Sequence, residues 1–215
     1  MADTNHRATQ RQYDRLSNFY DLISARSERI PRSTGLAKLR ITSGEYALEI
    51  GVGTGAALQE LIKSVAPDGK VFGTDLSTGM LKRTRQRLTE ANDTPPANLC
   101  CGDACWLPFL TSSLEVIFMS FTLELFSSSE IPLVLKECQR VLKPGGRIGV
   151  VSLSGTGPDT WMRRAYEWSH RRFPAWVDCR PILVKEALLG TGFKIHDSTC
   201  QSMWGLPVEI VIAQR

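Results

Sequence analysis

The stretch ALEIGVGTG, residues 47–55, decides the fold of this 215-residue chain. A short apolar run reaches Glu49, glycines then alternate at 51, 53 and 55, and apolar residues at helical spacing follow. Glycine at alternate positions allows a sharp turn and lets a ligand approach bare backbone, where a Cβ would collide with it. The helix after the turn presents unpaired N–H groups in its first turn. The stretch therefore predicts a turn that binds a nucleotide or a nucleoside.

Two kinds of ligand fit this turn. Gly51, Gly53 and Ala56 match the dinucleotide fingerprint in its alanine-terminated form, and Asp75 lies about where a ribose-binding acid is expected. Starting from Glu49, the same glycines also fit a Glu-x-Gly-x-Gly-x-Gly turn, which resembles the first motif of methyltransferases that use S-adenosylmethionine (AdoMet). A turn without a ligand is disfavoured, because three alternating glycines cost backbone entropy. The glycines alone leave the choice of ligand open.

Length and composition are those of one soluble globular domain. The net charge of +4 is too small to favour nucleic acid as a partner, and the basic cluster at 82–87 fits a solvated helix face. No uncharged apolar run is long enough to span a membrane, and the first residues lack the apolar stretch of a signal peptide. We expect a cytoplasmic protein without an integral membrane segment. Peripheral membrane contact and the oligomeric state stay open.

The six cysteines are expected to be free thiols in a reducing compartment. Cys100, Cys101 and Cys105 crowd one predicted strand end. The chain has no Cys-x-x-Cys pair and its three histidines are far apart, so we expect no metal site. Free cysteine is most often a small buried apolar residue.

Strands and helices alternate through most of the chain. The predicted strands are 44–50, 70–75, 97–101, 114–121 and 147–153. The predicted helices are 55–66, one that follows the N-cap candidate Ser77, and 129–142. This alternation predicts an α/β fold with a single doubly wound, mostly parallel sheet in one domain, residues 1–215. Ligands of such sheets bind beyond the carboxyl ends of the strands, where the glycine turn, Asp75, Asp103 and Ser120 all fall.

Two segments do not belong to this alternation. Residues 1–40 carry aromatic and aliphatic positions that are compatible with a helical lid over the ligand cleft. Residues 156–180 are rich in tryptophan and arginine, and an insertion there would hang over the strand ends. We therefore expect an acceptor pocket between the two segments. Its predicted apolar walls are Tyr13, Phe19, Tyr20, Trp161, Tyr166 and Trp168, with Arg163 or Arg164 available to orient an anionic oxygen.

Four further segments separate the two kinds of ligand. They are VFGTDLS at 71–77, CGDACWLPF at 101–109, FMSF at 118–121 and LKPGGR at 142–147. Together with the glycine turn they resemble class I AdoMet-dependent methyltransferases, most closely the ubiquinone/menaquinone C-methyltransferase family. The dinucleotide fingerprint has no account of 101–109 or 142–147, so NAD(P) becomes the runner-up.

The resemblance covers nearly the whole chain and implies a Rossmann-like enzyme that binds AdoMet and releases S-adenosylhomocysteine. Asp75 would accept the ribose hydroxyls, Asp103 would accept from the adenine amine, and the Ala104 N–H would meet a ring nitrogen. The cofactor-binding residues expected on this basis are Tyr20, Glu49, Gly51, Gly53, Thr54, Gly55, Asp75, Leu76, Met80, Asp103, Ala104 and Ser120.

The chain departs from that family directly after FMSF. The quinone enzymes carry Gly-Leu-Arg-Asn there, where this chain has TLEL at 122–125. Glu124 thus replaces a potential anion-orienting arginine, which a carboxylate does not imitate. The departure weakens the quinone assignment and leaves the cofactor assignment intact. We expect methyl transfer to a small molecule such as a quinol, a phenol or a thiol.

AdoMet carries an already activated methyl group, so the protein must position the acceptor and, where needed, remove a proton. The candidates for a general base, by residue type and location only, are His170, Tyr20, Glu124 and Asp178. Two other functions stay open. One is a non-catalytic AdoMet-binding protein, and the other is an arsenite-type enzyme with cysteine thiolates, although the cysteine spacing does not fit it.

Overall fold

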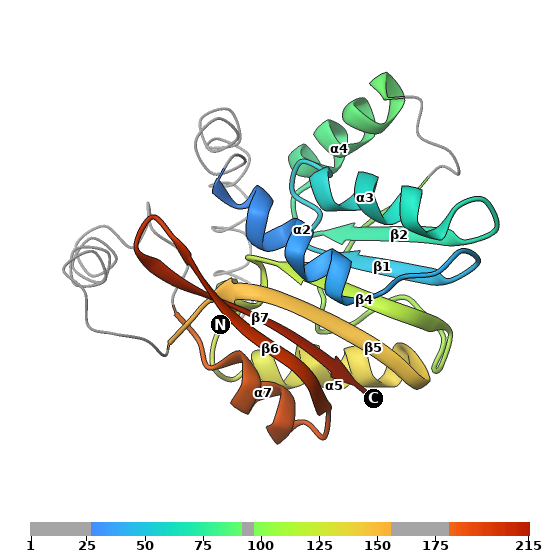
Figure 1. The fold of residues 1–215 in the computed structure, drawn as a ribbon. Helices are drawn as coiled ribbons and strands as arrows, with labels where there is room; N and C mark the ends of the chain where they lie inside the picture. The colour runs from blue at the N-terminus through green and yellow to red at the C-terminus, as the bar shows by residue number, and fades with distance from the viewer. Residues whose placement is uncertain (1–26, 92–96, 156–180) are drawn as a thin grey trace, which may run out of the picture.

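A computed structural model describes residues 27–91, 97–155 and 181–215. Within these ranges seven strands form one sheet, with helices on both faces (Figure 1). The strand order is β3-β2-β1-β4-β5-β7-β6, in which the first five strands are parallel and β7 is antiparallel to both of its neighbours. The predicted α/β class with a mostly parallel, doubly wound sheet is confirmed.

The elements follow the predicted alternation closely. The strands are β1 (Tyr46–Ile50), β2 (Lys70–Asp75), β3 (Asn98–Cys101), β4 (Leu114–Ser120), β5 (Leu142–Leu153), β6 (Lys194–Met203) and β7 (Leu206–Gln214). The helices are α2 (Arg29–Lys38), α3 (Ala56–Val65), α4 (Thr78–Glu90), the 3₁₀ helix η1 (Leu123–Leu125), α5 (Ile131–Val141) and α7 (Val184–Gly190). The β6–β7 hairpin was not predicted, because β6 is a polar edge strand without an apolar run. No helix in these ranges is long and apolar enough to cross a membrane.

Helices cover both faces of the sheet (Figure 1), and two clusters of buried apolar side chains form the core. Helices α2 and α3 contribute to the layer on one face, and α5 and α7 contribute to the layer on the other. The central strands β1 and β4 bury side chains on both faces, which explains why they are continuous apolar runs in the sequence. Because β1 to β5 run parallel to one another, their carboxyl ends lie at the same edge of the sheet.

Helix α2 approaches the sheet very closely at Gly35. A Cβ at this position would lie 2.7 Å from Val151 Cγ2 and 3.1 Å from a ring carbon of Phe118. The glycine thus allows a helix–sheet distance that a side chain would prevent. Of the predicted lid over residues 1–40, α2 lies in the described part and packs on the sheet. Residues 1–26 and 156–180 lie outside that part, so the lid, the insertion and the single-domain boundary stay predictions.

We expect Gly35→Leu to lower the free energy of unfolding by about 1–3 kcal/mol, because overpacking forces neighbouring side chains off their rotamers. Gly190→Leu is the matched control, since a Cβ on this glycine of α7 would meet nothing within 4 Å. Urea unfolding followed by circular dichroism measures both variants. Equal stability of the two would contradict the close approach of α2.

Candidate functional site

The glycine turn between β1 and α3 has one open face. Gly51, Gly53 and Gly55 all have positive φ, at 75°, 50° and 81°. A Cβ at Gly51 would lie 2.4 Å from the Thr122 side chain, and one at Gly55 would lie 2.8 Å from Thr84 Cγ2. A Cβ at Gly53 would meet nothing within 4 Å. Two of the glycines are therefore required by close packing within the protein, and Gly53 is the one with open space for a ligand.

The Gly53 peptide is held from both sides. Its N–H donates to Asp75 Oδ2 at 2.9 Å, and its carbonyl accepts from the Thr84 hydroxyl at 2.8 Å. The second oxygen, Asp75 Oδ1, accepts the Ser77 N–H at 2.8 Å. Because a carboxylate has about four acceptor positions, these two bonds alone do not exhaust it. Asp75 thus fixes the turn, and its carboxylate is a type of group that accepts hydroxyl hydrogen bonds.

Glu49 ends β1 directly before the turn and is only 3% exposed. Its Oε2 has no hydrogen-bond partner within the described ranges. Burial holds the pKa of Glu49 well above its ordinary value, with the Arg32 charge opposing this and Asp75 adding to it. A buried carboxylate oxygen without a donor is rare in native proteins and is costly. A ligand with an ammonium or N–H group would satisfy it.

The third strand end carries the predicted adenine-side residues. Asp103 Oδ1 accepts the Cys105 N–H at 2.8 Å, which closes a tight turn around the buried Ala104. The Gly102 N–H donates to the Asp75 carbonyl at 3.2 Å, so this turn is fastened to the end of β2. The two acids predicted to hold the nucleoside therefore lie on neighbouring strand ends.

Helix α5 anchors the rest of that loop. Arg140 donates to the carbonyls of Leu107 at 2.9 Å and Phe109 at 2.8 Å, while Glu137 accepts the Leu107 N–H at 2.9 Å. The hydrogen bond from Arg140 also holds the pKa of Glu137 below its ordinary value. The loop after β3 contains no regular element and is held instead by two charged side chains.

A buried acid follows the fourth strand end. Glu124 lies in η1, is 1% exposed, and accepts the Leu153 N–H on Oε1 at 3.2 Å. Its Oε2 has no hydrogen-bond partner among the described residues. Burial, with a smaller contribution from the Glu28 charge, raises the pKa of Glu124 to about 7. This carboxyl group therefore changes its protonation near neutral pH.

The structure brings most of the predicted residues to one edge of the sheet. Glu49, Gly51, Gly53, Thr54, Gly55, Asp75, Leu76, Met80, Asp103, Ala104, Ser120 and Glu124 lie at or just after the carboxyl ends of β1 to β4. Ser77 caps α4 as predicted, accepting the Met80 N–H at 3.2 Å. Tyr20, His170 and Asp178 fall outside the described ranges. None of these assignments is tested by a bound ligand, and all remain predictions.

Sequence reasoning missed two supporting residues on α4. Thr84 is fully buried and binds the Gly53 carbonyl. Arg87, which was assigned to a solvated face, donates to Thr54 Oγ1 at 3.2 Å. The signal for Thr84 was a polar residue on the apolar stripe of a helix, directly after the strand that ends in Asp75. No comparable signal distinguished Arg87 from its basic neighbours.

Two of the cysteines are buried thiols with a raised pKa. Burial and the nearby Asp103 charge raise the pKa of Cys105 to about 12. Burial also raises the pKa of Cys138. Both thiols stay protonated at neutral pH. Within the described part of the chain, no three His, Cys, Asp or Glu side chains group closely enough to hold a metal ion.

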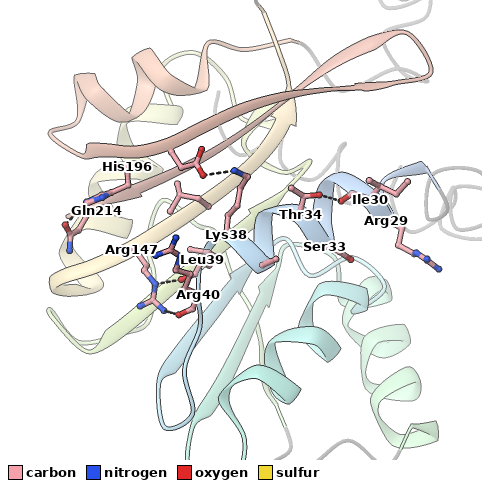
Figure 2. Close-up of a pocket in the computed structure, with 13 residues that line it drawn as sticks. Arg29, Ile30, Ser33, Thr34, Lys38, Leu39, Arg40, Arg147, His196 and Gln214 are labelled. Carbon is pink, nitrogen blue, oxygen red and sulfur yellow. Dashed lines mark hydrogen bonds and ion pairs between the residues drawn. The ribbon is translucent and has the colours of Figure 1, made fainter.

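A separate cavity of about 960 Å³ lies between α2 and the β6–β7 hairpin (Figure 2). None of the predicted cofactor-binding residues lines it. Two of the cations that line it are paired within the protein: Lys38 pairs with Asp197 at 2.6 Å, and Arg147 pairs with Glu45 at 2.7 Å and donates to the Arg40 carbonyl. These contacts fasten α2 to the sheet, so the cavity carries no candidate site.

Sequence comparison identifies a known domain that includes the residues at this edge of the sheet. Residues 47–146 match a family model described as a methyltransferase domain. The chain is 33% identical over 142 residues to a demethylmenaquinone methyltransferase of Lactobacillus johnsonii, with 66% of this chain and 56% of the relative covered. It is 30% identical over 159 residues to a ubiquinone/menaquinone biosynthesis C-methyltransferase of Burkholderia multivorans, with 73% and 62% covered. The matches thus span about three-fifths of these relatives.

Solved structures share the fold. A SAM-dependent methyltransferase from Aquifex aeolicus superposes with a TM-score of 0.68 at 18% identity, covering 94% of this chain and 97% of that one. A 1,6-didemethyltoxoflavin-N1-methyltransferase of Burkholderia thailandensis, solved with its acceptor and S-adenosylhomocysteine, gives 0.76 at 13% identity, covering 100% and 90%. The comparisons confirm the fold class and the resemblance that the motifs predicted.

Glu124→Gln should stabilise the protein at pH 8, and the gain should disappear as the pH falls to 5. The folded-state pKa of about 7 lies above the ordinary 4.5, so the folded chain binds the extra proton between these values. Wild-type stability therefore falls as the pH rises through this window, while the glutamine does not titrate. The shift corresponds to an upper bound of about 3 kcal/mol. Chemical unfolding at pH 5, 6, 7 and 8 measures the difference, and a pH-independent difference would contradict the raised pKa.

Proposed function

We propose an activity for this chain, whose residues 47–146 are a class I methyltransferase domain similar to the ubiquinone/menaquinone C-methyltransferases. The protein binds AdoMet, transfers its methyl group to a small-molecule acceptor and releases S-adenosylhomocysteine. The observation that carries this proposal is the open glycine turn whose central peptide is held by Asp75. A dinucleotide would also use such a turn, but the matched domain and relatives favour AdoMet.

The residues at the edge fit this cofactor. Asp75 would accept the ribose hydroxyls, and Asp103 would accept from the adenine amine beside Ala104. The unpartnered oxygen of Glu49 would accept from the cofactor's ammonium group. Leu76 and Met80, at the start of α4, and Ser120, at the end of β4, would line the remaining walls.

AdoMet supplies a methyl group on a sulfonium, which needs no nucleophile from the protein. The chain's own task is to hold the acceptor in line and exclude water, and such positioning is worth about 7–11 kcal/mol. A general base with a pKa near the working pH adds about 10²–10⁴-fold. Glu124 has a pKa of about 7 and fits this requirement by protonation and burial. His170 and Tyr20 remain candidates by residue type only.

The acceptor is proposed to bind between residues 1–40 and 156–180, above the strand ends. The names of the relatives favour a quinol, while Glu124 at the position of their arginine favours a different acceptor. Incubation with methyl-labelled AdoMet and separate quinol, phenol, thiol and amine acceptors tests the activity. AdoMet binding without transfer to any acceptor would support the alternative, a non-catalytic AdoMet-binding protein.

Asp75→Ala is expected to weaken AdoMet binding about tenfold to a hundredfold, because hydrogen bonds to a charged acceptor contribute about 1.5–3 kcal/mol. Thr84→Val is the matched control: it removes the other bond to the Gly53 peptide and no proposed cofactor contact. Calorimetry with AdoMet measures both, with circular dichroism to verify folding. Equal losses of affinity in the two variants would show that the effect comes from the turn and not from the ribose contact. A heat of binding with NADH but none with AdoMet would contradict the cofactor assignment.

Asp103→Asn should lower AdoMet affinity about tenfold or more while the protein stays folded. The amide oxygen can still accept the Cys105 N–H, so the turn is kept, but the new NH₂ group cannot accept from the adenine amine. Titration with AdoMet at fixed salt gives the affinity. A folded variant with unchanged affinity would rule out the proposed adenine contact.

A further inference from the structure

We propose that Glu124 binds a cationic nitrogen of the methyl acceptor, so that the acceptor is an amine. The inference rests on the proposed function, because it assigns the acceptor class of that same site. It concerns recognition of the nitrogen and leaves open which acceptor atom receives the methyl group.

The backbone places Glu124 directly beside the glycine turn. Thr122 occupies the space that a Cβ at Gly51 would need, so the segment after β4 touches the turn. Two residues later, Glu124 reaches across to the Leu153 N–H at the end of β5. Its carboxylate therefore lies at the carboxyl edge of the central strands, next to the proposed cofactor position.

The carboxylate lacks the partner that a buried charge needs. Oε1 accepts the Leu153 N–H, and hydrogen bonding from the Glu124 N–H and the Ser152 hydroxyl also favours the charged form. Oε2 still has no hydrogen-bond partner within the described ranges, and the side chain is 1% exposed. A buried ion without a partner is strongly destabilising, so such groups are normally paired. The missing partner of Oε2 would have to be a proton, a hydrogen-bond donor or a cation.

Neighbouring charges make the region more negative. Glu28, directly before α2, acts on Glu124 and disfavours its charged form. Arg32 on α2 is the cation that acts on Glu28 and Glu49, and it also lies 3.9 Å from Glu60. Arg32 is thus shared among other acids and is not among the groups that act on Glu124, so an incoming cation would be stabilised there.

The resemblance described above points the same way. It implies an arginine in the quinone enzymes where this chain has Glu124, and an arginine suits the anionic oxygen of a phenol-like acceptor. A buried carboxylate repels such an oxygen and attracts an ammonium group.

Two isosteric probes, benzylamine and benzyl alcohol, test the proposal. Both are titrated at pH 8 into the full chain saturated with S-adenosylhomocysteine, and binding is followed by ligand-observed NMR. At this pH most of Glu124 is ionised. We expect the wild type to bind benzylamine at least tenfold more tightly than benzyl alcohol. Glu124→Gln should abolish the preference, because glutamine keeps the shape and loses the charge.

Glu209→Gln is the matched control, since Glu209 is another buried carboxylate with a raised pKa, located on β7. It should keep the preference for the amine. No preference in the wild type, no binding of either probe, or a preference that survives in Glu124→Gln would overturn the proposal. Calorimetry with S-adenosylhomocysteine distinguishes failure of the proposed function from failure of this inference. If S-adenosylhomocysteine does not bind, the proposed function is wrong. If it binds but the amine is not preferred, only this inference is wrong.

Discussion

The site depends on the contact between the Asp75 carboxylate and the Gly53 N–H. Glycine in a left-handed conformation is not held by side-chain packing, so the turn needs a bond from outside. Asp75 supplies it from the neighbouring strand, and Thr84 holds the other side of the same peptide from α4. One acid thereby fixes the floor of the candidate site.

Charge is distributed unevenly over the molecule. The sheet edge that carries the candidate site holds several buried acids, two of which have an unpartnered oxygen. The cavity beside α2 instead holds cations that are paired with carboxylates and carbonyls. Ion pairs hold elements together, whereas a buried carboxylate oxygen without a partner would be stabilised by a hydrogen-bond donor or a cation. For this reason the acidic edge is the stronger functional candidate, although the cavity beside α2 is large.

The sequence was sufficient for the parallel core, because each buried strand is a continuous apolar run and each helix is amphipathic. It also located the acids at the strand ends, since these follow from the strand boundaries. It could not predict the β6–β7 hairpin, whose outer strand is polar, or the role of Thr84, which depends on a contact 31 residues away. The burial of Glu124 could not be predicted from the sequence either, because a charged residue in a short 3₁₀ helix gives no sequence signal for its environment.

The close approach of Gly51 and Thr122 couples two parts of the proposed site. Residue 51 belongs to the proposed cofactor floor, whereas residue 122 begins the segment that is proposed to face the acceptor. Because the Thr122 side chain fills the space beside Gly51, a larger side chain at either position would displace the other residue. A substitution at 122 would therefore have to preserve the side-chain volume that meets Gly51.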